Sequence, residues 1–198
     1  MASNDYHFVT SWRIAAAPAE ISDVLADAPA LSRWWPSVYL EIREVAPGNE
    51  DSGLGKVVEL WTKGFLPYTL RWQFTVTESS PPTGFRLEAT GDFVGRGIWT
   101  LAATRGPSDP DGPLTIVTYD WLIVAEKGIL KRLSLVMKPI FAANHHWCMR
   151  RGEASLKLEL ARRHAVGDPT ILAAIPPPPG PTFPHNLELA RRPRLGRG

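Results

Sequence analysis

The chain has 198 residues, with 22 Lys and Arg, 20 Asp and Glu, and a formal net charge of +2. This length fits one domain with a tail and is enough to bury a core without disulfides or metals. The single cysteine, Cys148, excludes an intrachain disulfide framework and a cysteine-based zinc site. The basic residues form no stripe on a predicted strand face, so we expect no nucleic-acid partner.

No segment reaches the ~18 consecutive apolar residues of a membrane span. The first six residues are polar and do not have the pattern of a secretory signal. We therefore expect a cytoplasmic protein without a membrane span. Eight Trp and 19 Pro are unusual for this length, and the Trp residues are spread from Trp12 to Trp147, which assigns them to the fold rather than to one cluster.

A strand and two short helices are predicted at the start of the chain. Apolar residues alternate loosely over 6–14, which predicts a strand. Pro18 suits the first position of a helix, and apolar residues then recur at spacings of three and four up to residue 27. A second short helix is expected over 30–35, after Pro29 and before Pro36.

A run of strands without intervening helices follows. The segments alternate between apolar and polar residues and are separated by turns rich in Gly, Pro, Asn and Asp. Such alternation gives each strand one buried face and is typical of antiparallel sheets. With the first strand, these segments predict a curved antiparallel sheet of about six to seven strands. The segments are 38–45, 55–62, 68–77, 85–90, 95–104 and 115–125.

One long helix is predicted over 129–164, and Pro139 should kink or divide it. It is the one predicted element long enough to cover the apolar face of the sheet, so the sequence predicts an α+β domain over 1–165. A stripe at spacings of three and four is expected to face the sheet. Its members are Leu133, Met137, Ile140, Asn144, Trp147, Arg151, Ala154, Leu158 and Ala161.

Residues 166–198 differ in composition and are predicted to be a proline-rich, arginine-ended tail. Pro176–Pro179 are consecutive prolines, which favour an extended polyproline conformation rather than a helix or sheet. Such a strip could bind a partner domain with an aromatic groove. The other interpretation is an inert extension.

The order of elements and five motifs resemble the START/SRPBCC superfamily, and in particular its bacterial polyketide cyclase/dehydrase branch. The resemblance covers about residues 6–164 and implies a helix-grip fold, in which a curved sheet surrounds a long C-terminal helix and encloses a cavity. It also implies either the carriage of a hydrophobic ligand or the cyclisation of a polyketide. The motifs are Trp34-Trp35-Pro36, Gly95-Arg96-Gly97-Ile98-Trp99, Thr118-Tyr119-Asp120-Trp121, Asn144-His145-His146-Trp147 and Met149-Arg150-Arg151-Gly152-Glu153.

Aromatic residues on the inward faces of the predicted strands are the candidate walls of such a cavity. Ligand pockets are mostly apolar and aromatic, although the same rings could instead fill the core. The predicted ligand-binding residues are Trp72, Phe74, Trp99, Tyr119 and Trp121 from the strands and Ile140, Asn144 and Trp147 from the helix.

Four residues are candidates for acid or base chemistry: Glu59, Tyr119, Asn144 and His145. Glu59 interrupts an apolar run, and an inward carboxylate there would have a raised pKa, whereas a shift of one residue in register would turn it outward. His145 and its neighbour His146 point ~100° apart on a helix and have no His, Asp or Glu four residues on. We therefore expect no metal site and no cofactor.

These observations predict the binding of a small apolar or aromatic molecule, polyketide-like or lipid-like, in an internal cavity. The first alternative is an enzyme of the polyketide cyclase/dehydratase type acting on such a ligand, with one of the four candidates as acid or base. The second is an interaction protein that uses the proline-rich tail. The sequence specifies neither the ligand nor the oligomeric state.

Overall fold

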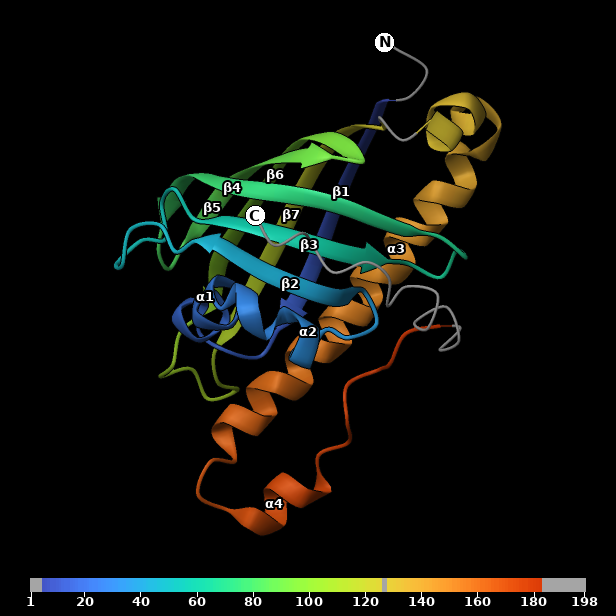
Figure 1. Ribbon diagram of the computed structural model, residues 1–198. Coiled ribbons are helices and arrows are strands. Elements are labelled where there is room, and N and C mark those ends of the chain that lie inside the picture. The colour runs from blue at the N-terminus through green and yellow to red at the C-terminus, as the bar shows by residue number, and fades with distance from the viewer. Residues whose placement is uncertain (1–4, 126–127, 183–198) are drawn as a thin grey trace.

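The computed structural model describes residues 5–125 and 128–182, and its main element is one seven-stranded sheet (Figure 1). The strand order is β1-β7-β6-β5-β4-β3-β2, and each neighbouring pair is antiparallel. The predicted antiparallel sheet and the α+β class are thus confirmed. The strands are β1 Asp5–Ile14, β2 Tyr39–Ala46, β3 Val57–Lys63, β4 Thr69–Ser80, β5 Gly84–Gly91, β6 Phe93–Arg105 and β7 Leu114–Ala125.

Short helices separate β1 from β2, and a long helix follows the sheet. These short elements are α1 (Pro18–Ala26), the 3₁₀ turn η1 (Ala28–Ala30) and α2 (Leu31–Trp34). The long helix α3 (Gly128–His164) runs across the sheet, and α1 and α2 pack beside its C-terminal half (Figure 1). Pro139 lies inside α3 and does not divide it into two helices.

The C-terminal half of α3 is tightly packed against tryptophans. Trp34 is fully buried, and Trp12 and Trp35 are almost so. Trp35 lies against Gly152 of α3 so closely that a Cβ atom on this glycine would overlap the indole ring. Leu156, one turn further along α3, is also fully buried. This end of the domain therefore has a filled core.

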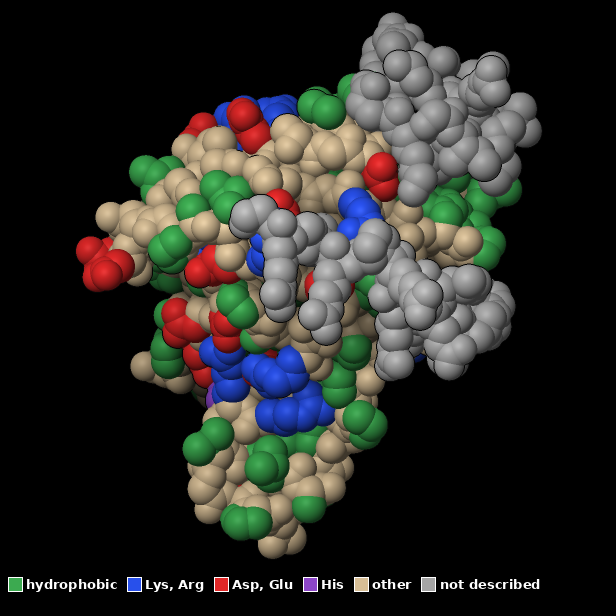
Figure 2. Space-filling view, viewed as in Figure 1, with side chains coloured by type: hydrophobic (Ala, Val, Ile, Leu, Met, Phe, Trp, Pro, Cys, Tyr) green, Lys and Arg blue, Asp and Glu red, His purple; other side chains and the backbone are tan. Residues whose placement is uncertain are grey.

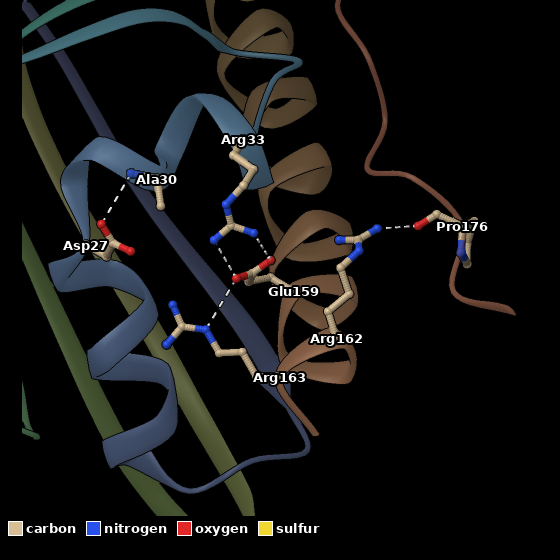
Figure 3. Close-up of polar contacts among 7 residues, drawn as sticks. All are labelled: Asp27, Ala30, Arg33, Glu159, Arg162, Arg163 and Pro176. Carbon is tan, nitrogen blue, oxygen red and sulfur yellow. Dashed lines mark hydrogen bonds and ion pairs between the residues drawn. The ribbon is translucent and has the colours of Figure 1, made fainter. Parts of the chain in front are cut away.

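A buried carboxylate joins α2 to α3 at the same end (Figure 3). Glu159 is 2 % exposed and accepts two hydrogen bonds of 2.9 Å from the Arg33 guanidinium. Arg163 donates a third bond, of 3.3 Å, to Glu159. The neighbouring Arg162 points away from this pair and donates to the carbonyl of Pro176. Figure 2 shows Lys and Arg side chains gathered between the sheet and α4 on the viewed face.

The chain returns along α3 after it ends. A short helix that the sequence pattern did not predict, α4 (Pro169–Ala174), begins where the Asp168 side chain accepts from the amides of Thr170 and Ile171. Residues 175–182 are neither helix nor strand and end at Thr182, whose hydroxyl donates to the carbonyl of Gly64. The arginine-rich end of the predicted tail lies outside the described residues. Among the residues that are described, no helix combines the length and the apolar character needed to cross a membrane.

Candidate functional site

A cavity of about 200 Å³ lies between the sheet and the middle of α3, from Phe141 to Met149. Strands β1 to β7 supply most of the wall because their inward side chains alternate as predicted, and α2 and its neighbours close one side. Six of the eight predicted ligand-binding residues line it. They are Trp72, Phe74, Trp99, Tyr119, Trp121 and Asn144.

The sheet wall is a row of stacked rings on neighbouring strands. The rings of Trp99 and Tyr119 are 4.2 Å apart at 20°, and those of Tyr119 and Trp121 are 5.4 Å apart at 22°. Gly97 makes room for this row, since a Cβ there would be 2.6 Å from the Tyr119 hydroxyl oxygen. Trp72 continues the wall and donates its indole N–H to Thr62 Oγ1 at 3.0 Å. The wall is therefore aromatic, and its rings are packed closely against one another.

The helix wall differs from the predicted stripe. Ile140 is 38 % exposed and lies outside the lining, and Trp147 is half-buried beneath the Arg151 guanidinium instead of facing the cavity. The predicted stripe is thus rotated by one residue, because it follows the most apolar positions, whereas the inward face is partly polar. Among the α3 residues whose side chains are described, those that line the cavity are Phe141, Asn144, His145, Cys148 and Met149.

Asn144 holds the β3–β4 loop from inside. Its Oδ1 accepts hydrogen bonds from the amide of Phe65 at 2.9 Å and from that of Leu66 at 3.3 Å. Gly64 lies so close that a Cβ there would overlap the Asn144 side chain. The oxygen of this candidate residue is therefore engaged by backbone, while its NH₂ group makes no hydrogen bond to the described residues.

His145 lies in the lining as an uncharged ring. It stacks on Phe8 with centroids 4.3 Å apart, and its Nε2 is 3.4 Å from Thr10 Oγ1. Burial, with a smaller contribution from His146, lowers the pKa of His145 to about 4. Near neutral pH the ring is therefore neutral and keeps a nitrogen lone pair. Among the described residues there is no cluster of three or more His, Cys, Asp or Glu that could hold a metal ion.

Glu59 does not reach the cavity, so its prediction as an inward acid is wrong. It lies on the outer face of β3, where its carboxylate accepts from Arg43 at 2.9 and 2.7 Å. The inward residues of β3 are Val58 and Leu60. Trp61 misled the assignment: it is an outer-face ring that is buried beneath the Arg71 guanidinium, 4.7 Å from the ring centroid.

Six polar lining residues were not predicted as site residues: Tyr6, Tyr39, Thr62, Lys63, Tyr68 and Cys148. Burial raises the pKa of Tyr68 to about 12 and that of Tyr39 further. Burial also raises the pKa of the Cys148 thiol to about 12, which makes it a poor nucleophile. Simple alternation could not have placed Tyr39 inward, because an irregularity in register between Tyr39 and Glu41 separates it by three residues from Ile42, which also packs against the core.

Solved structures with the same fold include two aromatase/cyclases and a norcoclaurine synthase. The Zhui aromatase/cyclase from Streptomyces sp. R1128 is 16 % identical, with a TM-score of 0.60, over 82 % of this chain and 98 % of that one. The di-domain ARO/CYC BexL from the BE-7585A biosynthetic pathway is 16 % identical, with a TM-score of 0.56, over 84 % of this chain and 52 % of that one. Norcoclaurine synthase from Thalictrum flavum, a point mutant in complex with a transition-state analogue, is 13 % identical, with a TM-score of 0.52, over 78 % of this chain and 95 % of that one.

At these identities the likeness establishes the fold. The chain has a helix-grip fold, as the resemblance of its motifs predicted. No protein-family model and no curated protein matches the chain. What the site does must therefore be argued from its own residues.

Proposed function

We propose that the protein binds a small, largely apolar aromatic molecule in the cavity between the sheet and α3. The observation that carries the proposal is the space of about 200 Å³ walled by stacked aromatic rings. A core built for stability alone is filled by its own side chains, whereas ligand sites keep a concave apolar space with a few polar groups. Trp72, Trp99 and Trp121 would provide aromatic contacts to the ligand.

Titration with N-phenylnaphthylamine, an uncharged probe that fluoresces in apolar surroundings, tests the proposal. We expect saturable binding to the full chain and displacement by other flat apolar compounds. Leu70→Trp should block binding because Leu70 lines the cavity, and Leu122→Trp should not, because Leu122 is exposed on the outer face. Unfolding by urea would verify that both variants fold. Equal binding by the two variants would refute the proposed site.

A second candidate function is a cyclase-type reaction, and His145 is the observation that favours it. A neutral imidazole in the cavity wall can accept a proton from a carbon that lies between two carbonyl groups. The resulting carbanion would add to a ketone carbon of the same chain, and loss of water would complete an aromatic ring. Tyr39 and Tyr119 would bind the carbonyl oxygens during this step.

Incubation with a synthetic linear polyketone tests this candidate, with mass spectrometry to detect the loss of water. We expect turnover by the full chain and by His146→Phe, since His146 is exposed. His145→Phe keeps a ring that can stack on Phe8 and should abolish turnover without loss of probe binding. Turnover that persists in His145→Phe would remove this residue from the proposed reaction.

A further inference from the structure

Several polar groups in the cavity wall can donate hydrogen bonds. Tyr39, Tyr68 and Tyr119 all lie in the lining, and their hydroxyls make no hydrogen bond within residues 5–125 and 128–182. The NH₂ group of Asn144 also makes no hydrogen bond to the described residues, because the β3–β4 loop binds only the side-chain oxygen. Buried donors of this kind need an acceptor, and a bound ligand can supply it.

These phenols keep their protons near neutral pH. Burial raises the pKa of Tyr119 well above its ordinary value, and Tyr39 and Asp120 raise it further. The pKa of Tyr39 is raised by burial in the same way, with a smaller contribution from Cys148. Tyr39 packs edge-on against Trp35, and both Tyr39 and Tyr119 line the same cavity. Together they form a pair of neutral donors beside the row of stacked rings.

No full charge in the described lining is available to a ligand anion. The described lining contains no Asp, Glu or Arg. Lys63 belongs to it but follows the inward Thr62 on β3, so its side chain leaves the sheet on the other face and donates to the carbonyl of Thr182. His145 is neutral. A carboxylate in this space would lose its hydration without gaining a counter-charge.

We infer that the cavity selects an uncharged aromatic ligand that carries ketone or quinone oxygens, and that it rejects a carboxylate of the same shape. The ketone oxygens accept from the hydroxyls of Tyr39 and Tyr119, and the aromatic rings of the ligand contact the row formed by Trp99, Tyr119 and Trp121. This inference rests on the proposed binding function and adds the chemistry by which the cavity discriminates between ligands of equal size.

Three compounds of nearly equal shape test the inference: fluorene, fluorenone and fluorenone carboxylate. Each is used to displace N-phenylnaphthylamine from the full chain near neutral pH. We expect fluorenone to compete about threefold to tenfold more strongly than fluorene, the effect of one or two hydrogen bonds between neutral groups. Fluorenone carboxylate should compete at least about tenfold more weakly than fluorenone, because its charge is desolvated without a partner.

Variants that remove one hydroxyl and keep the ring show which tyrosines bind the ketone oxygen of fluorenone. Tyr39→Phe and Tyr119→Phe should weaken fluorenone and leave fluorene unchanged. Thr100→Val, which removes an exposed hydroxyl next to Trp99, is the matched control and should change neither. If the probe binds but the three compounds compete equally, or if the carboxylate competes best, the inference is overturned and the binding function stands. If the probe does not bind at all, both are overturned.

Discussion

The two halves of α3 face the same sheet but differ in how closely they pack against it. In the C-terminal half the inward residues are closely packed: Gly152 lies against Trp35, and Ser155 and Leu156 are fully buried. In the N-terminal half the inward residues whose side chains are described, among them Asn144 and His145, border the cavity. One helix thus serves as a core element at one end and as a cavity wall at the other.

This difference in packing shows how the fold can contain an internal cavity and remain stable. An unfilled space forfeits dispersion contacts and lowers stability. Here the space is confined to one end, while the tryptophans and the Arg33–Glu159 pair consolidate the other. Substitutions in the C-terminal half of α3 should therefore change global stability. Substitutions beside the cavity should instead change the β3–β4 loop and ligand binding.

Gly152→Ala is expected to have the largest effect. Alanine would normally favour a helix interior over glycine by about 1 kcal/mol. At this position, however, the new Cβ overlaps the rigid, buried ring of Trp35. We expect a net loss of about 2 kcal/mol in the free energy of unfolding, measured by urea denaturation. Gly106→Ala is the control and should be nearly neutral, because a Cβ added at Gly106 would have no atom of another part of the chain within 4 Å. A more stable Gly152→Ala variant would contradict the close packing of α3.

Glu159→Gln should have the next largest effect on stability. It leaves the guanidinium groups of Arg33 and Arg163 together without the carboxylate that both bind. Because the side chain of Arg33 is 59 % exposed, water compensates part of the loss, and we expect about 1–2 kcal/mol. Glu153→Gln removes an exposed helical pair with Lys157 and should cost about 0.5 kcal/mol or less. Equal losses in the two variants would show that burial adds nothing to the Glu159 pair.

The same carboxylate predicts a pH dependence. Burial opposes ionisation of Glu159, but the hydrogen bonds and charges of Arg33 and Arg163 outweigh it and hold its pKa below the ordinary value of 4.5. The stabilising contribution is therefore complete above pH 4.5 and is lost as the pH falls through the lowered pKa. Below pH 4.5 the free energy of unfolding should fall more steeply in the natural chain than in Glu159→Gln. Parallel curves would contradict this assignment.

The strands were predictable because a period of two is robust. A strand has only two faces, so Trp72 and Phe74, or Tyr119 and Trp121, identify the inward face by their aromatic side chains alone. β3 is the exception, because the apolar Trp61 lies on its outer face with Glu59 and reversed the assignment of this strand. One atypical residue is enough to reverse the predicted inward and outward faces of a short strand.

The inward face of α3 was harder to predict because it is not the most hydrophobic one. Its members include Asn144, His145, Gly152 and Glu159, each of which needs a tertiary partner to be stable there. Hydrophobic periodicity cannot find partners that lie elsewhere in the sequence. In contrast, α4 carried a local signal, since Asp168 before Pro169 is a typical helix start.

Asn144→Leu tests the part of α3 that borders the cavity and should change the free energy of unfolding less than the two substitutions above. Leucine cannot accept from the amides of Phe65 and Leu66, so the β3–β4 loop should lose its inner anchor. We expect a loss of about 1 kcal/mol in global stability and faster hydrogen exchange at these two amides. Asn144→Asp retains an acceptor oxygen and should preserve their protection. Unchanged exchange in Asn144→Leu would mean that the loop is held by other contacts.

Thr182→Val tests the anchor on the outside of the same loop and should have the smallest effect. The Thr182 hydroxyl reaches the carbonyl of Gly64 at 3.3 Å, a long hydrogen bond, whereas the backbone carbonyl that accepts from Lys63 is retained in the variant. We expect a change of about 0.5 kcal/mol or less in the free energy of unfolding. Exchange of the Phe65 amide should stay slow, because Asn144 still accepts from it. If Thr182→Val released the loop as strongly as Asn144→Leu, the returning chain, and not α3, would be the element that closes this side of the cavity.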